Sequence, residues 1–177
     1  MISDDTLVAR TLSEGNHHFG ALVKRYADYI FGYGLRLTGG NASLAEDLSQ
    51  QTFLRAFKYL PSYDKKHRLR HQNDQNRFRN WLTGIASNCF RDLIKIEQRY
   101  QPLEHAIEPI FDPVYRDSHE FFALIKPLGA EDRMLFILRY VYEFSVDEIS
   151  EQTGLNSGTV KSRLSRAMQR LRDSQHD

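Results

Sequence analysis

The sequence is poor in the residues that several common classes of protein require. A single cysteine among 177 residues, Cys89, excludes an internal disulfide and any zinc site built from several cysteines. Ten glycines and five prolines together fall below the usual share of roughly 12%, which argues against turn-rich sandwiches and collagen-like chains. The longest apolar run, residues 134–138, is far shorter than the ~18 residues of a membrane span.

The N-terminus lacks the basic and apolar segments of a signal peptide, so we expect a soluble, cytoplasmic protein. Eleven Phe and nine Tyr provide material for a core and argue against disorder. Helical periodicity recurs along the chain, whereas no alternating strand pattern is visible. We therefore predict an all-α fold of two small helical domains joined by an extended linker.

Charge is unevenly distributed although the net charge is only +1. Residues 61–79 hold six basic and two acidic side chains, and residues 156–172 hold five basic and no acidic ones. Residues 97–120, between them, hold six acidic and two basic side chains. Two basic segments that flank an acidic one indicate contact with a polyanion at two places. An ordinary solvated face is the alternative for either segment alone.

Three of the five prolines, Pro102, Pro109 and Pro113, fall in the acidic stretch, which has no clear periodicity. Proline cannot continue a helix and favours extended backbone. We predict a linker over residues 98–117, between domains at residues 1–97 and 118–177.

The last third of the chain has the pattern of a helix-turn-helix. Residues 145–153 predict a short helix with a capping box of Ser145 and Glu148, Gly154 fits a left-handed helix end, and a longer helix then runs to about residue 172. One stripe of the longer helix must face the core: Val160, Leu164, Ala167, Met168 and Leu171. On its other faces we expect Arg166 to contact a base and Lys161 and Arg163 to contact phosphates. The full set of expected DNA contacts is Ser157, Thr159, Lys161, Ser162, Arg163, Ser165 and Arg166.

Residues 45–57 predict a helix with a mixed polar face that also carries Leu54. Gly39 and Gly40 end the preceding helix, and Ser43 with Glu46 predicts the cap of this one. We expect Phe53, Phe57 and Leu60 on the other side. The polar face suits protein binding, and an ordinary solvated face is the alternative.

Residues 78–95 predict a helix with a core stripe of Phe78, Leu82, Ile85, Ala86, Cys89 and Leu93. The opposite face holds amides and cations with few acids: Asn80, Gly84, Ser87, Asn88, Arg91 and Lys95. Beside Trp81 and a basic loop, this face suits single-stranded DNA. A core anchor is the alternative role for Trp81.

Two sets of motifs resemble the bacterial sigma-70 family. Residues 46–53 (Glu-Asp-Leu…Gln-Thr-Phe) and 78–92 (Phe-x-x-Trp-Leu…Ile-Ala-x-Asn…Asp) resemble its second conserved region. Residues 128–167, which end in Gly-Thr-Val-Lys-Ser-Arg-Leu-Ser-Arg-Ala, resemble its fourth. The chain is too short for the further regions of a housekeeping sigma factor, so it resembles the extracytoplasmic-function (ECF) group.

The resemblance implies a subunit that binds core RNA polymerase and directs promoter-specific transcription initiation, as in stress responses. The helix-turn-helix domain (118–177) would recognise the −35 element, and the N-terminal domain (1–97) would recognise the −10 element and help to melt it. The linker is either a tether or a nucleic-acid mimic that occupies a positively charged polymerase channel. The implied partners are core polymerase, promoter DNA and an anti-sigma factor. No enzymatic activity, cofactor, metal or small-molecule substrate is implied.

The resemblance also assigns residues to two further surfaces. The helix at residues 45–57 would dock on the clamp helices of the largest polymerase subunit through Asp47, Gln50, Gln51, Phe53, Leu54 and Arg55. The implied −10 contacts are Arg77, Asn80, Trp81, Asn88, Arg91 and Lys95. Residues 64–76 depart from the family because they form a longer and more polar connection, so no base-reading residue is assigned there.

Two other classes of protein are compatible with parts of the pattern. A one-component regulator would combine a helical sensor domain with a helix-turn-helix and bind duplex DNA as a dimer, but it gives the Phe-x-x-Trp-Leu segment no role. A metalloenzyme fails on histidine spacing, because only His67 and His71 are four residues apart and both lie in the predicted loop.

Overall fold

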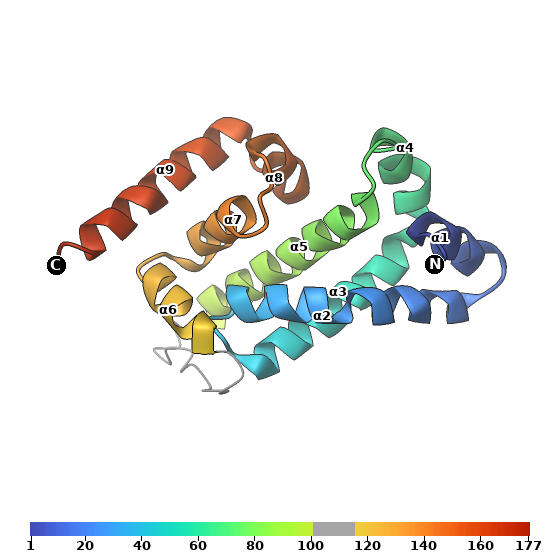
Figure 1. The fold of residues 1–177 in the computed structure, drawn as a ribbon, viewed down its shortest axis with the longest axis horizontal. Helices are drawn as coiled ribbons and strands as arrows, with labels where there is room; N and C mark the ends of the chain where they lie inside the picture. The colour runs from blue at the N-terminus through green and yellow to red at the C-terminus, as the bar shows by residue number, and fades with distance from the viewer. Residues whose placement is uncertain (101–115) are drawn as a thin grey trace.

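The computed structural model of the protein describes residues 1–100 and 116–177, and every regular element in these ranges is a helix, as predicted. The expected linker lies outside the described residues except at its two ends. In chain order the elements are α1 (Asp4–Ser13), a 3₁₀ turn (Asn16–His18), α2 (Phe19–Leu37), α3 (Ala42–Ser62), a π-helical turn (Tyr63–His67), α4 (Arg68–Arg70), α5 (Arg77–Tyr100), α6 (Arg116–Ile125), α7 (Ala130–Tyr140), α8 (Val146–Thr153) and α9 (Ser157–Ser174) (Figure 1).

The turn between α2 and α3 differs from the predicted capping box. Gly39 and Gly40 have positive φ angles of 66° and 89°, and α3 begins directly afterwards. The side chain of Asn41 accepts a hydrogen bond from the Leu44 N–H at 3.0 Å. Asn41 is therefore the N-cap, and the assignment of that role to Ser43 is wrong because an equally suitable cap residue precedes it.

The polar segment after α3 is helical over residues 63–70, so the prediction of a loop there is wrong. Tyr63 is fully buried, and its ring lies edge-on to Phe78 with centroids 5.2 Å apart. Asp64 and Arg68, one turn apart, form an ion pair at 2.9 Å. Burial of the tyrosine and the i,i+4 pair stabilise a helical path through residues that look loop-like by composition.

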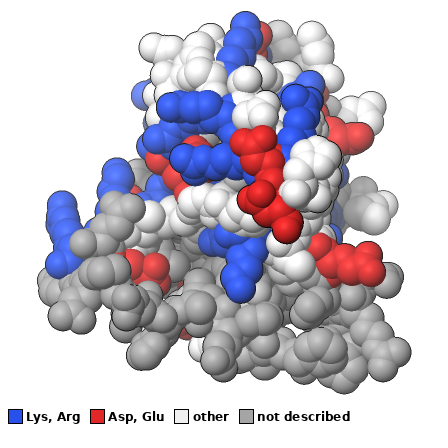
Figure 2. Space-filling model, turned by 90° about the vertical axis from the view of Figure 1, so that its left-hand side faces the viewer, with Lys and Arg blue, Asp and Glu red and all other residues white. Residues whose placement is uncertain are grey.

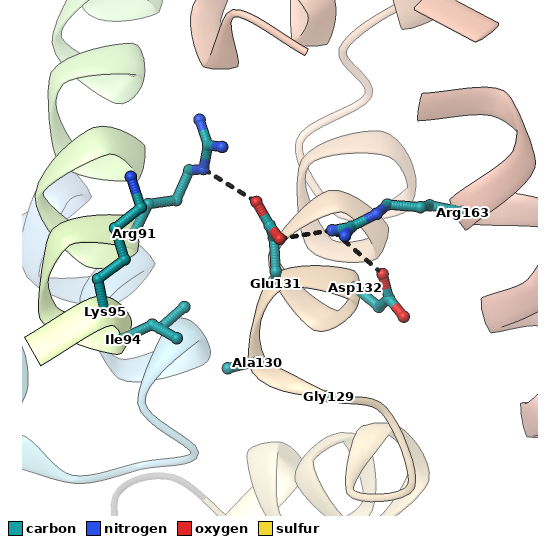
Figure 3. Close-up of a pocket in the computed structure, with 8 residues that line it drawn as sticks. All are labelled: Arg91, Ile94, Lys95, Gly129, Ala130, Glu131, Asp132 and Arg163. Atoms are coloured by element: carbon teal, nitrogen blue, oxygen red, sulfur yellow. Dashed lines mark hydrogen bonds and ion pairs between the residues drawn. The ribbon is translucent and has the colours of Figure 1, made fainter. Parts of the chain in front are cut away.

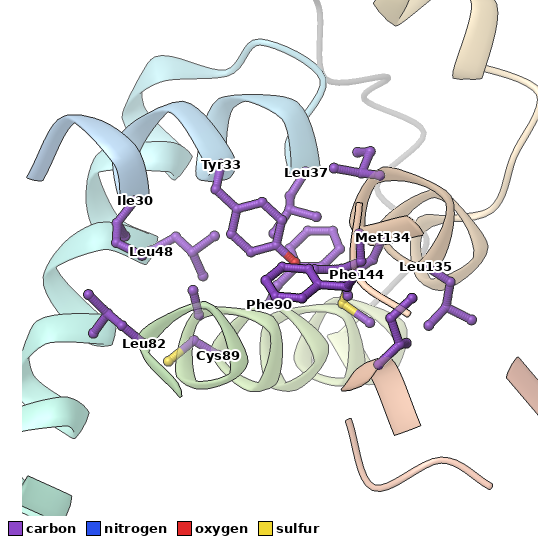
Figure 4. Close-up of a cluster of buried hydrophobic side chains, with 14 of the residues drawn as sticks. Ile30, Tyr33, Leu37, Leu48, Leu82, Cys89, Phe90, Met134, Leu135 and Phe144 are labelled. Carbon is purple, nitrogen blue, oxygen red and sulfur yellow. The ribbon is translucent and has the colours of Figure 1, made fainter. Parts of the chain in front are cut away.

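The two halves of the chain pack against each other and share one hydrophobic core. Tyr142, between α7 and α8, packs edge-on against Tyr29 and Tyr33 of α2, with centroid separations of 5.6 Å and 5.1 Å. Arg36 of α2 donates a hydrogen bond to the Tyr142 hydroxyl at 3.1 Å. Figure 4 shows Phe144 beside side chains of α2 and α5. Burying an aromatic side chain contributes roughly 1.5–3 kcal/mol, so this contact stabilises a closed arrangement of the two halves.

Candidate nucleic-acid interface

The helix-turn-helix has the local geometry that the sequence predicts. The Ser145 hydroxyl accepts the Glu148 N–H at 3.1 Å, and the Glu148 carboxylate accepts the Ser145 N–H at 2.8 Å. Gly154 ends α8 with a left-handed φ of 73°. The expected stripe of α9 faces the core, with Val160, Leu164, Ala167 and Leu171 buried and Met168 half-buried. The opposite face of α9 is therefore directed to solvent.

Most of the predicted contact residues of α9 are accessible. Five are exposed, namely Thr159, Lys161, Ser162, Ser165 and Arg166, and Ser157 is half-buried at the start of the helix. Figure 2 shows Lys and Arg side chains gathered in the upper part of the molecule, with a few acidic ones between them. Among the described residues Arg166 contacts no carboxylate, and its Nε donates weakly to the Ser162 carbonyl at 3.4 Å. This arginine is available to a ligand.

Arg163 differs from the other residues of this set. Its Nη1 lies 2.5 Å from Glu131 Oε2 and 3.6 Å from Asp132 Oδ1, both at the start of α7. The side chain is therefore directed toward α7 in this arrangement (Figure 3).

The N-terminal end of α5 brings three of the predicted −10 residues together. Arg77 forms an ion pair with Asp5 and donates to the Gln72 carbonyl at 2.9 Å. Asn80 Nδ2 donates to Asp74 Oδ2 at 2.8 Å. The half-buried Trp81 packs in an aromatic cluster, with its ring centroid 4.9 Å from that of Tyr63 and 5.6 Å from that of Phe78.

The middle of the same α5 face contacts the C-terminal half, although Asn88 stays exposed. Asn88 Nδ2 donates to the Gln152 carbonyl at 3.3 Å, and Arg91 Nη1 donates to the Thr153 carbonyl at 2.5 Å. Arg91 Nε also donates to Glu131 Oε1 at 3.0 Å (Figure 3). Glu131 thus binds Arg91 of α5 and Arg163 of α9 at the same time. The exposed Lys95 lies beside this ion-pair network and, like Arg91, lines the pocket drawn in Figure 3.

Glu131 is ionised in this setting. Partial burial favours its protonated form, but hydrogen bonds and charge interactions with Arg163 and Arg91 outweigh burial, so the pKa of Glu131 lies below its usual value. At neutral pH the carboxylate therefore forms ion pairs with both arginines.

Two small residues of α5 are buried, so their predicted place on an open polar face is wrong. A Cβ atom on Gly84 would lie 3.4 Å from the side chain of Gln152 in α8. The Ser87 hydroxyl forms a hydrogen bond of 2.7 Å with the Tyr33 hydroxyl of α2. Helices from distant parts of the sequence cover both positions, and periodicity within α5 does not reveal them.

The polar face of α3 is largely open to solvent. Asp47, Gln50, Gln51 and Leu54 are exposed, Leu54 to 65%, and Phe53 is half-buried. Arg55 forms an ion pair with Asp92 of α5 at 2.7 Å, which raises its pKa. Phe57, expected on the other side of α3, is 39% exposed, and its ring packs against Phe19 in a T-shaped arrangement with centroids 5.2 Å apart. The exposed residues of this face are therefore accessible to a partner.

Comparison with known proteins matches both halves. The family Sigma-70 region 2 matches residues 22–100, and the family Sigma-70, region 4 matches residues 119–171. The chain is 32% identical to the ECF RNA polymerase sigma factor SigE of Mycolicibacterium smegmatis over 163 residues, which are 86% of this chain and 59% of SigE. It is 27% identical to the ECF RNA polymerase sigma factor SigW of Bacillus subtilis, with 90% of this chain and 89% of SigW covered.

The chain belongs to the ECF sigma factors of the sigma-70 family.

Among solved structures, the sigma factor RpoE of Bartonella quintana, in complex with the anti-sigma factor NepR, has a similar fold. Its TM-score is 0.62 at 22% identity, with 88% of this chain and 94% of that chain covered.

 A second solved structure of similar fold is CnrH in complex with the cytosolic domain of CnrY, with a TM-score of 0.64 at 23% identity over 98% of this chain and 97% of that chain. At these identities the likeness concerns the fold.

Each matched region lies in one half of this sigma factor. The region 2 match covers most of α2 and all of α3, α4 and α5, and the region 4 match covers most of α6 to α9. The domain limits 1–97 and 118–177 stay predictions. Within residues 1–100 and 116–177, no helix is both long and apolar enough to cross a lipid bilayer.

Sequence reasoning missed the residues that join the two halves. Glu131 precedes a helical pattern and looks like an ordinary acidic residue of a first helical turn. Thr153 and Gln152 contribute backbone carbonyls, which carry no sequence signal. Only the packing of α7 and α8 on α5 reveals that these groups bind predicted DNA contacts.

Proposed function

We propose that this sigma factor binds core RNA polymerase and directs it to promoters by recognising a −35 and a −10 element. The observation that carries the proposal is the exposed face of α9. There Arg166 pairs with no carboxylate of the described residues and lies on a helix-turn-helix with the expected cap and turn. A bidentate arginine–guanine contact provides about 1–3 kcal/mol of discrimination between bases. Lys161 is placed to contact phosphate, and Arg163 can do so once it leaves Glu131.

The α5 face is proposed to hold the −10 element as a single strand. Arg77, Asn80 and Trp81 lie at one end of this face, and Asn88, Arg91 and Lys95 follow along the helix. Binding energy from these contacts would offset unstacking of a base, which costs a few kcal/mol. Because Arg91 is bound by Thr153 of α8 and Glu131 of α7, the strand can reach this arginine only after the two halves separate. Asn88 is exposed, and its amide would exchange the Gln152 carbonyl for the strand.

The exposed face of α3 is proposed to dock on the clamp helices of the largest polymerase subunit. Asp47, Gln50, Gln51 and Leu54 present polar groups and one apolar side chain there, with Phe53 and Arg55 at its edge. We also propose an anti-sigma factor as a partner, since RpoE of Bartonella quintana forms such a complex. In this function the chain supplies binding energy and carries out no covalent chemistry.

Reconstitution with core polymerase tests the proposal. The full chain should convert core enzyme into one that starts transcription on a library of promoter fragments, with start sites that share two upstream elements. Dimeric binding to duplex DNA without any effect on the polymerase would overturn the proposal and favour a one-component regulator.

A further inference from the structure

Two histidines and a glutamate meet where the polar segment after α3 touches α8. His67 ends the π-helical turn and His71 follows α4, one helical turn later. The backbone N–H of His71 donates to the backbone carbonyl of His67 at 3.0 Å, so both side chains lie on the same side of the helix. Glu151 comes from α8 in the other half of the chain. One ligand atom from each of the three residues lies within 4.8 Å of the other two.

The hydrogen bonds of this cluster are incomplete. His71 Nε2 lies 2.8 Å from Glu151 Oε1, and the rings of His67 and His71 are 4.4 Å apart. His67 Nε2 is buried and has no hydrogen-bond partner among the described residues. A buried polar atom without a partner is unfavourable, so this nitrogen has the chemistry to accept a ligand.

We propose that His67, His71 and Glu151 bind a divalent transition-metal cation of the Zn²⁺ class, with water completing the coordination. Two histidines four residues apart with one carboxylate form a well-known ligand set for zinc. With bonds of about 2.0–2.2 Å, ligand atoms in a tetrahedral site lie about 3.4 Å apart. Side-chain movements of about 1 Å would bring the three atoms to that spacing.

The surroundings of the site fit this role. Arg70 Nη1 lies 3.4 Å from Glu151 Oε1, and its side chain is 72% exposed. This arginine can therefore move into solvent when a metal takes its place beside the carboxylate.

A metal bound here would connect the two halves of the molecule. Both histidines belong to the N-terminal half, and Glu151 belongs to α8, which contacts Asn88 and Arg91 of α5. The cation would thus stabilise the closed arrangement and keep these two proposed −10 contacts occupied. The inference goes beyond the proposed function, because metal binding requires neither polymerase nor DNA.

Titration of the metal-free full chain with Co²⁺ and Zn²⁺ tests the site. We expect one bound equivalent, the visible absorption of tetrahedral Co²⁺, and competition between the two metals. His71→Gln and Glu151→Gln should each weaken binding more than about tenfold, since even groups that only support a ligand contribute 10–100-fold. His17→Gln, at an exposed histidine outside the cluster, is the matched control and should bind like the parent.

Three outcomes would overturn the inference. If His71→Gln binds the metal as tightly as the parent, the metal does not bind at this cluster. If Glu151→Gln does so, the metal does not connect the two halves. An equal loss in His17→Gln would identify adventitious binding to surface histidines. Circular dichroism should show parental helicity for all three variants. Because no polymerase is present, failure here leaves the proposed function standing.

Discussion

Replacing Glu131 by glutamine should open the closed arrangement of the two halves. Glu131 is the carboxylate that joins Arg91 of α5 to the start of α7, at 3.0 Å, and it also binds Arg163 of α9 at 2.5 Å. The amide in Glu131→Gln keeps the size of the side chain but removes its charge. Arg91 would then be held to the C-terminal half chiefly by the Thr153 carbonyl.

The magnitude follows from the geometry of the pair. A hydrogen bond to a charged group contributes about 1.5–3 kcal/mol. The side chains of Arg91 and Glu131 are 20% and 30% exposed, so solvent screens part of this energy. We expect Glu131→Gln to cost the closed state about 1–2 kcal/mol, which is a factor of roughly 5–30 in the ratio of closed to open molecules.

Energy transfer between dyes on α1 and α9 measures the open fraction. Asp132→Asn is the matched control: it removes the neighbouring carboxylate, which pairs with Arg163 and Arg170 inside the C-terminal half and not with α5. The open fraction should rise in Glu131→Gln and stay near the parental value in Asp132→Asn. Equal effects of the two variants would refute the role of Glu131.

Because Glu131 stabilises the closed arrangement only when it is ionised, the open fraction should depend on pH. The pKa of Glu131 in the closed form lies below its ordinary value of 4.5, so its contribution is complete above that pH and is lost as the pH falls through the lowered pKa. The open fraction of the parent should rise on acidification below 4.5, and this component should be missing in Glu131→Gln.

Three further predictions concern other surfaces. Arg166→Ala should weaken promoter binding by about 1–3 kcal/mol and relax specificity at one base pair of the −35 element, as measured with a set of point-mutated promoters. The double change of Asp47 and Gln51 to alanine should weaken binding to core polymerase at unchanged helicity, and unchanged affinity in a titration would exclude this surface. Tyr33→Phe removes the 2.7 Å hydrogen bond to Ser87 and should lower the free energy of unfolding by about 0.5–1.5 kcal/mol in a denaturant titration.

Local signals in the sequence were sufficient for the helices and for most of the exposed α9 face. The periodicity of α9 predicted its buried stripe, and the Ser145 capping box and the left-handed Gly154 are present as expected. These features depend on residues within one or two turns of each other, and such short-range preferences are encoded in the local sequence. The same reasoning failed where a tertiary contact decided, as for Tyr63 and the helical turn that follows it.

The tertiary structure alone decided how the two halves meet. Arg91 and Thr153 are 62 positions apart, and His71 and Glu151 are 80 apart, so no periodic pattern relates them. Packing of α2 and α8 on α5 covered Ser87 and Gly84, and packing of α7 on α5 brought Glu131 to Arg91. The sequence determined which faces are polar or apolar, whereas the fold determined which polar groups reach solvent, because burial depends on neighbours brought together by the whole chain.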